Sequence, residues 1–164
     1  MGKDHALETD APHTAPDGSR LRIAVIVSDY NSEITSALLE DALAELRSCG
    51  VADENIFQAR VPGAFELPVA AQAALQRGDI DAVICLGCVI RGETSHYDVI
   101  CDSISHALPA VALKFNRPVI AGVLTTENIA QARARAGAEK GPKGRQAARA
   151  ALAMCRTLRD LGAG

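Results

Sequence analysis

Four short runs of apolar, mostly β-branched residues alternate with segments of helical periodicity along this chain. The apolar runs predict buried strands over Leu21–Val27, Ile56–Val61, Asp81–Ile90 and Pro118–Leu124. Parallel strands need a crossover connection of a dozen or more residues, which a helix after each strand supplies. The alternation therefore predicts an α/β fold of three layers, α/β/α and flavodoxin-like, in which helices cover both faces of a four-stranded, mostly parallel sheet.

The helices are expected where residues that favour helix ends lie beside the apolar periodicity. Asn31 or Ser32 can cap the helix after the first strand. Pro68 suits the first turn of the second helix, where its missing N–H costs nothing. The segment Thr125–Asn128 is expected to be a loop that caps a helix ending at Ala136.

A chain of 164 residues is expected to form one domain, here residues 20–164 behind a mobile polar tail of residues 1–19. The tail lacks the apolar core of a secretory signal, and no apolar run reaches the ~20 residues that span a membrane. We therefore expect a cytoplasmic protein with no membrane partner. The formal net charge of −3 differs from the basic excess of nucleic-acid binders, so no nucleic-acid partner is expected.

Polar side chains gather in the loops that follow the four predicted strands. These loops meet at one edge of a parallel sheet, and ligands of open α/β sheets bind at that edge. They carry an exposed ring, Tyr30, a carboxylate, Glu66, and an imidazole, His96. This set suits a small polar ligand with a flat ring, whereas Phe65 nearby suits either the pocket or the core.

The segment Gly87–Asp98 holds the most varied chemistry of these loops. Free N–H groups at Gly92–Thr94, before a helix, can bind an anion, although the same residues also suit a simple turn and N-cap. No P-loop or G-x-G-x-x-G fingerprint is present. His96 can transfer protons near neutral pH, or it can be a hydrogen-bonded residue of the first helical turn.

The five cysteines include a C-x-x-C pair, Cys85 and Cys88, which allows a redox or metal site. Residues three apart on a strand point to opposite faces, and no second C-x-x-C is present. We therefore interpret both as packed apolar residues and expect no metal.

A basic segment lies near the C-terminus. Such a run usually forms a solvated face, but it can also bind a phosphate, including the phosphate of a neighbouring subunit's site. Its members are Arg133, Arg135, Lys140, Lys143 and Arg145.

Three blocks of the chain resemble the 6,7-dimethyl-8-ribityllumazine synthase family of riboflavin biosynthesis. They are Val61–Pro68, Gly92–Asp98 and Leu124–Asn128, in the family's order, and the resemblance runs from about Arg20 to about Leu161. It implies the condensation of 5-amino-6-(D-ribitylamino)uracil with 3,4-dihydroxy-2-butanone 4-phosphate to 6,7-dimethyl-8-ribityllumazine and inorganic phosphate. The family's reaction needs no cofactor.

The resemblance also implies roles for individual residues. His96 transfers protons, and Arg135 of the adjacent subunit binds the phosphate of the second substrate. Tyr30 stacks on the pyrimidine. The other substrate-binding positions are Asn31; Ala64, Phe65 and Glu66 at the ribityl chain; Cys88, Val89 and Ile90 at the uracil ring; Glu93 and Thr94 at the phosphate; and Lys143 beside it.

The family assembles as pentamers with the site between neighbours, and some members form 60-subunit shells. The uninserted link Gly137–Gly144 favours the shell by resemblance. Ala121 stands where the family often places a Phe from the neighbouring subunit, and Glu93 stands where a small residue is common.

Two other functions are compatible with the residues. One is a non-catalytic flavin- or pterin-binding module on the same fold, and the other is a structural shell protein without activity. A phosphate clamp beside His96 argues against the first, and Ala121 is the only feature that favours the second.

Overall fold

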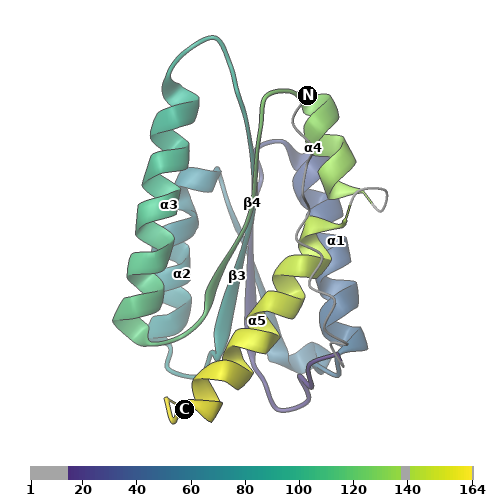
Figure 1. Cartoon of the computed structure of the whole chain (residues 1–164), viewed down its shortest axis with the longest axis vertical. Coiled ribbons are helices and arrows are strands. Elements are labelled where there is room, and N and C mark those ends of the chain that lie inside the picture. Colours follow the sequence, from purple (N-terminus) through teal and green to yellow (C-terminus); the bar gives the residue numbers. More distant parts are fainter. Residues whose placement is uncertain (1–14, 138–140, 164) are drawn as a thin grey trace.

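The computed structural model describes residues 15–137 and 141–163, and its elements follow the predicted alternation (Figure 1). Every strand pair is parallel, in the order β2-β1-β3-β4. The three-layer, flavodoxin-like prediction is confirmed. The strands are β1 (Ile23–Ser28), β2 (Ile56–Val61), β3 (Ala82–Ile90) and β4 (Val119–Thr126).

Helices cover both faces of the sheet (Figure 1). On one face lie α2 (Leu67–Gln76) and α3 (His96–Phe115), with Pro68 in the first turn of α2 as predicted. On the other lie α1 (Ser32–Ser48), α4 (Ile129–Ala136) and α5 (Lys143–Asp160). Among the described residues, no helix is both long and apolar enough to cross a bilayer.

The central strands are buried on both faces, which fixes the position of their ends. Along β1, Ile23, Val25 and Val27 pack with side chains of α1 and α5. The alternate residues Ala24 and Ile26 pack with side chains of α2 and α3. Burial of each Val or Ile side chain contributes about 1.5–3 kcal/mol, so the strands are held firmly and the loops after them start from fixed points.

The fourth strand ends two residues later than predicted. Thr125 and Thr126, expected in a loop, pair with Val89 and Ile90 of β3. β-Branched threonines fit a pleated strand well, so the ladder continues to the end of β3. The following Asn128 caps α4 as predicted, because its side-chain oxygen accepts from the Gln131 N–H at 2.9 Å.

The predicted tail lies outside the described residues as far as residue 14, and Lys140 lies outside them too. In residues 15–19, the described part of the predicted tail, the Gly18 N–H donates to the Cys49 carbonyl at 2.8 Å.

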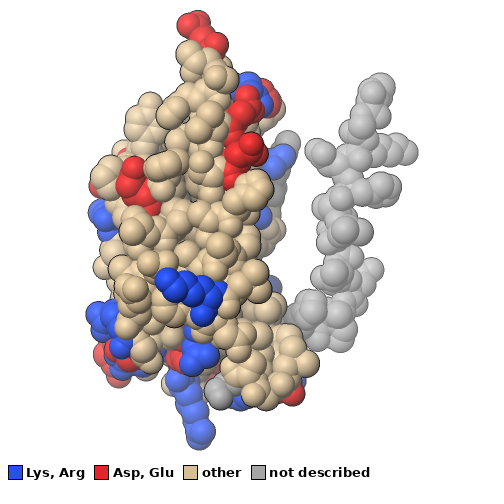
Figure 2. Space-filling model, turned by 90° about the vertical axis from the view of Figure 1, so that its left-hand side faces the viewer, with Lys and Arg blue, Asp and Glu red and all other residues tan. Residues whose placement is uncertain are grey.

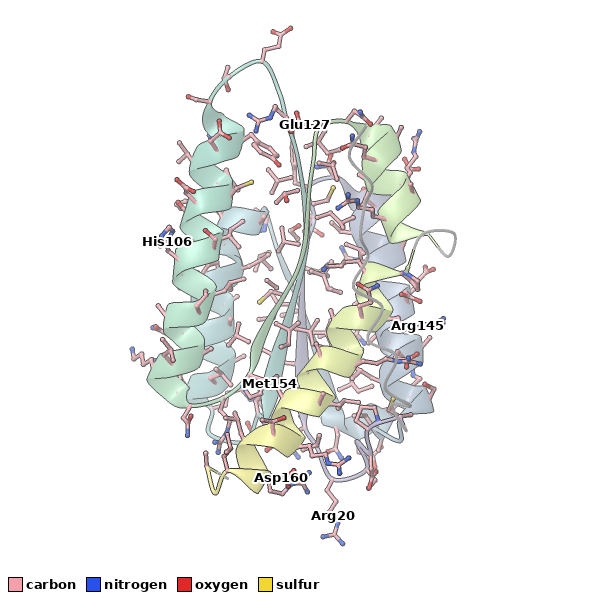
Figure 3. All side chains as sticks on the ribbon, in the orientation of Figure 1. Arg20, His106, Glu127, Arg145, Met154 and Asp160 are labelled. Atoms are coloured by element: carbon pink, nitrogen blue, oxygen red, sulfur yellow. The ribbon has the colours of Figure 1, made fainter. Side chains whose placement is uncertain are left out.

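The start of α5 lies directly against α1. A Cβ atom at Gly144 would overlap the Leu38 carbonyl oxygen and lie 3.1 Å from the Ala42 nitrogen. Beside it, the Arg145 N–H donates to an Asp41 carboxylate oxygen at 2.7 Å. Figure 3 labels Arg145 at this junction. Only glycine allows the two backbones to approach this closely.

Substitution of Gly144 by alanine is expected to lower the free energy of unfolding by about 1–3 kcal/mol, because the added methyl group meets backbone that cannot yield. Denaturant unfolding followed by circular dichroism measures the change. Gly92→Ala is the control, since a Cβ there meets nothing within 4 Å. Equal unfolding midpoints for the two variants would contradict this account of the α1–α5 contact.

Candidate active site

Three of the predicted loops close around one cavity at the carboxyl edge of the sheet. The cavity has a volume of about 780 Å³ and lies between the loops after β1, β2 and β3 and the first turns of α3. It holds most of the residues expected to bind substrate. Its lining comprises Tyr30, Pro62, Gly63, Ala64, Phe65, Glu66, Cys88, Val89, Ile90, Gly92, Thr94, His96, Tyr97, Val99 and Ile100.

The two predicted aromatic residues stand at the cavity with large exposed surfaces. Tyr30 is 73% exposed and Phe65 is 52% exposed, so Phe65 belongs to the pocket and not to the core. The Tyr30 N–H donates to the Pro62 carbonyl at 3.1 Å, which fixes the loop that carries the ring. Exposed rings beside a cavity offer faces for stacking on a planar ligand.

Asn31 supports this site from outside the cavity lining. It adopts the left-handed conformation at φ 58° and ψ 48°, and its side chain does not cap α1. Asn31 is thus the N-cap residue of α1, one of the two predicted positions, but its side chain does not make the capping bond. The Asn31 Nδ2 instead donates to the Cys88 carbonyl at 2.9 Å. This bond ties the loop after β1 to the end of β3, where Cys88 lines the cavity.

Glu66 is held in place by the backbone of its own loop. Its Oε2 accepts from the Gly63 N–H at 2.9 Å, which closes the short 3-10 turn Ala64–Glu66. The second carboxylate oxygen carries no hydrogen bond from the described residues, so it is available to a hydroxyl group of a ligand in the cavity.

His96 is the first residue of α3 and lines the cavity. Its backbone N–H donates to the Thr94 Oγ1 at 3.3 Å, and Thr94 lines the same cavity. Within the described chain, no hydrogen bond engages the imidazole. The alternative that the sequence also allowed, a hydrogen-bonded histidine of the first helical turn, therefore does not fit. The ring is therefore available for proton transfer with a bound ligand.

The predicted phosphate-binding cations lie elsewhere on this chain. Arg135 is on α4 and Lys143 begins α5, and both helices lie on the opposite face of the sheet from α3 (Figure 1). Neither lines the cavity that holds His96. A single subunit thus does not bring the predicted cations to the predicted proton-transfer residue.

The arginines of the basic segment are all exposed, but they differ in whether they form ion pairs. Arg133 forms an ion pair with Glu33 at 2.9 Å, and Arg145 forms one with Asp41 at 3.5 Å. For Arg135, which is exposed, the described residues supply no ion-pair partner. The solvated-face interpretation thus fits Arg133 and Arg145, whose charges α1 neutralises.

Two further predicted positions do not line the cavity. Ala121 lies on the edge strand β4, where it pairs with Cys85 of β3, and it is exposed on this subunit. Glu93 lies in the loop beside the lining residues Gly92 and Thr94.

The lining residues Tyr97 and Val99 are among those that received no role from the sequence. Both belong to the first turn of α3, and Ile100, at the start of the next turn, also lines the cavity. A helical turn that begins with His96 places residues three and four positions later on the same side, so this spacing was the available signal for Val99 and Ile100.

The cysteines are free and do not form a metal site in the described part of the chain. Cys85 packs with the α2 and α3 side chains, and Cys88 packs with those of α1 and α5, as their spacing predicted. Burial raises the pKa of the Cys85 thiol to about 12 and that of Cys88 to about 11. Both thiols are therefore protonated at neutral pH.

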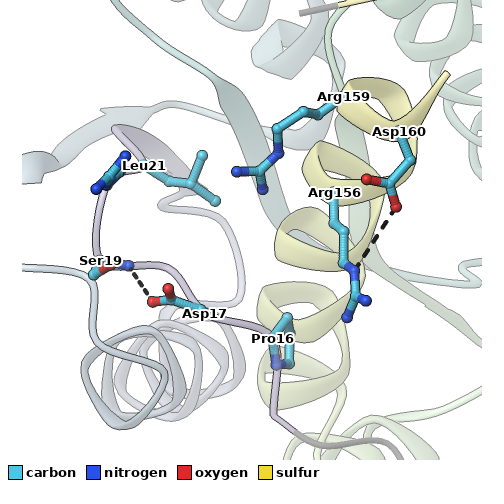
Figure 4. A pocket seen from close by; sticks show the side chains of 8 residues that line it. Pro16, Asp17, Ser19, Leu21, Arg156, Arg159 and Asp160 are labelled. Carbon is cyan, nitrogen blue, oxygen red and sulfur yellow. Dashed lines mark hydrogen bonds and ion pairs between the residues drawn. The ribbon is translucent and has the colours of Figure 1, made fainter. Parts of the chain in front are cut away.

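A second cavity, of about 370 Å³, lies at the opposite edge of the sheet (Figure 4). Residues Asp17 and Arg20 line one side, and Arg156 and Arg159 of α5 line the other. A hydrogen bond from the Ser19 N–H, at 2.9 Å, lowers the pKa of Asp17. The lining of this second cavity contains none of the predicted site residues.

The sheet order and the cavity together define a class of protein. This is a flavodoxin-like α/β protein with a cavity beyond the carboxyl ends of its parallel strands, where ligands of such sheets bind, and aromatic, carboxylate and imidazole groups surround that cavity.

Comparison with known proteins identifies the family within that class. The family model for 6,7-dimethyl-8-ribityllumazine synthase matches residues 20–159. A 6,7-dimethyl-8-ribityllumazine synthase from Cytophaga hutchinsonii is 48% identical over 139 residues, which cover 85% of this chain and 87% of that protein. The chain belongs to the 6,7-dimethyl-8-ribityllumazine synthase family, and it is an enzyme of riboflavin biosynthesis.

The buried thiols are expected to resist alkylation. Iodoacetamide reacts with thiolates, and a raised pKa lowers the thiolate fraction at any pH below it. In the native protein at pH 8, mass spectrometry should find Cys85 and Cys88 unmodified, whereas all five cysteines should react after unfolding in guanidinium. Rapid modification of native Cys85 would contradict its burial.

Proposed function

We propose that this enzyme joins 5-amino-6-(D-ribitylamino)uracil to 3,4-dihydroxy-2-butanone 4-phosphate. The amine attacks the ketone carbon and one water leaves, which gives an imine. Inorganic phosphate is then eliminated, and ring closure releases a second water to give 6,7-dimethyl-8-ribityllumazine. The family match over residues 20–159 carries this proposal, and the rings, carboxylate and imidazole of the cavity support it.

The pyrimidine substrate is assigned to the cavity at the carboxyl edge. Tyr30 stacks on the planar ring, and the backbone of Cys88–Ile90 meets its polar edge. Ala64, Phe65 and Glu66 hold the ribityl chain, whose hydroxyl groups suit the available oxygen of Glu66. The exposure of Tyr30 and the hydrogen bond from Asn31 to Cys88 support this placement.

His96 is assigned to proton transfer, and Glu93 and Thr94 to the phosphate-binding turn. This turn precedes α3, whose first backbone N–H groups favour an anion. The two substrates are already reactive, so orientation and proton transfer account for most of what the protein contributes.

The assembly is assigned as a homopentamer in which Arg135 and Lys143 of one subunit complete the site of the next. Their place on the opposite face of the sheet from His96 supports a shared site. An exposed apolar surface on α2 and α3, which includes Val69, Val99 and Leu113, supports burial against another copy. Figure 2 views this side and shows broad areas without charged side chains. Closure into a 60-subunit shell stays a prediction.

Removal of His96 and removal of Arg135 are expected to affect different kinetic parameters. His96→Ala should lower kcat by about 10²-fold, because a positioned proton-transfer group is lost. Arg135→Ala should mainly raise the KM for the butanone phosphate, because an interaction with the phosphate is lost. Fluorescence of the lumazine product, measured above the uncatalysed background, gives both parameters.

Arg133→Ala is the matched control for Arg135, because it removes a neighbouring guanidinium that is already paired with Glu33. Unchanged kinetics in both the His96 and Arg135 variants would overturn the residue assignments. A wild-type rate no faster than background, from folded protein, would overturn the proposed reaction.

Mixed assemblies are expected to recover activity if neighbours share each site. His96→Ala and Arg135→Ala subunits, co-expressed in equal amounts, should form some sites with both groups intact. With butanone phosphate held below the wild-type KM, where loss of Arg135 also lowers the rate, random mixing in a ring gives about one quarter of the wild-type activity, because each site needs two intact contributions. Affinity tags of two kinds isolate the mixed assemblies.

The control is an assembly of each variant alone, in which every site is defective. Activity of the mixed assemblies no greater than the average of the two pure variants would contradict a site shared between subunits.

A further inference from the structure

Arg91, at the exit of β3, contacts three side chains from two other segments. Its Nη2 and Nη1 donate to the two Asp98 carboxylate oxygens at 3.1 and 3.3 Å. Its Nε lies 3.0 Å from the Glu127 Oε2, directly after β4. Its guanidinium carbon lies 4.2 Å from the centroid of the Tyr97 ring. Figure 3 labels Glu127 at this edge of the sheet.

These contacts bridge a loop that has little other support. Among the described residues, Gly92 and Glu93 make no backbone hydrogen bond, and the His96 N–H has only the weak bond to Thr94. The Arg91 backbone N–H donates to the Thr126 carbonyl at 2.9 Å, which anchors the start of the loop to β4. The Arg91 side chain then reaches across the loop to the first turn of α3.

The first turn of α3 is the part of the cavity where proton transfer is assigned. His96 and Tyr97 line the cavity, and Asp98 follows directly after them. Arg91 itself does not line the cavity, so its guanidinium acts on the site through these neighbours. Two carboxylates hydrogen-bonded to it raise the pKa of Arg91, so its charge is constant wherever the enzyme is active.

We propose that Arg91 is a positioning residue, whose contacts with Asp98, Glu127 and Tyr97 fix the first turn of α3 and thereby hold the His96 ring in its place for proton transfer. This inference rests on the proposed role of His96. A single exposed ion pair stabilises a fold little. The Arg91 guanidinium, however, makes two hydrogen bonds to Asp98 and also contacts a second carboxylate and a ring. Together these contacts restrict the orientation of the first turn of α3. A displacement of about 1 Å at a reacting group can cost up to 10²-fold in rate.

Arg77 provides a matched control at the opposite edge of the sheet. It also makes two contacts with one carboxylate, Asp79, at 3.0 and 3.1 Å, and its guanidinium lies 4.8 Å from the Phe57 ring centroid. The Arg77→Ala and Arg91→Ala variants therefore remove similar interactions at similar exposure, but only Arg91 lies beside the cavity.

The test is a double-mutant cycle on turnover, combined with amide hydrogen exchange of residues 92–98. Arg91→Ala should lower kcat by about 10-fold with little change in either KM, and Arg77→Ala should leave kcat unchanged. In the His96→Ala background, Arg91→Ala should lower kcat no further, because the group that it positions is gone. Exchange in residues 92–98 should accelerate in Arg91→Ala and not in Arg77→Ala.

Several results would overturn the proposal. Equal kcat values for the Arg77 and Arg91 variants, or the same loss from Arg91→Ala with and without His96, exclude action through His96. Unchanged exchange in residues 92–98 excludes ordering of the turn, and this readout needs no activity. A full kcat in His96→Ala would instead overturn the role proposed for His96, and the inference about Arg91 with it.

Discussion

Burial of the two central strands on both faces is the constraint on which the rest of this structure depends. The β1 and β3 side chains alternate between two apolar clusters, one beneath each helical layer. This packing fixes the strands in the register that ends β1 beside Val61 and β3 beside Thr126. The loops that leave the strands therefore start from fixed points, and these loops supply the rings, the carboxylate and the imidazole of the cavity.

The same two-faced sheet separates the predicted groups. His96 begins a helix on one face, whereas Arg135 and Lys143 belong to helices on the other, so the chain cannot bring them together by itself. In the proposed assembly, a neighbouring subunit would supply Arg135 and Lys143 to the loops around His96, which would resolve this separation. Activity would then depend on association, and the apolar surface on α2 and α3 would serve the site as well as stability.

Much of the fold could be predicted from the sequence, because apolar periodicity and turn residues mark most strand and helix boundaries. The end of β4 could not, since Thr125 and Thr126 suit a loop as well as a strand until the partner Val89 is known. Asn31 suits a helix cap locally, but a distant carbonyl, that of Cys88, determines what its side chain does. Spacings do not place Ala121 and Arg135 away from the cavity either, because those outcomes depend on how the strands and helices pack together.

A structure of the assembled enzyme with a bound analogue of the ribitylaminouracil, in the presence of inorganic phosphate, tests the central claim most directly. The account predicts the pyrimidine ring against Tyr30, the ribityl chain beside Glu66, and phosphate between Thr94 of one subunit and Arg135 of its neighbour. An analogue bound away from the carboxyl edge of the sheet, or a phosphate site completed without Arg135, would contradict it.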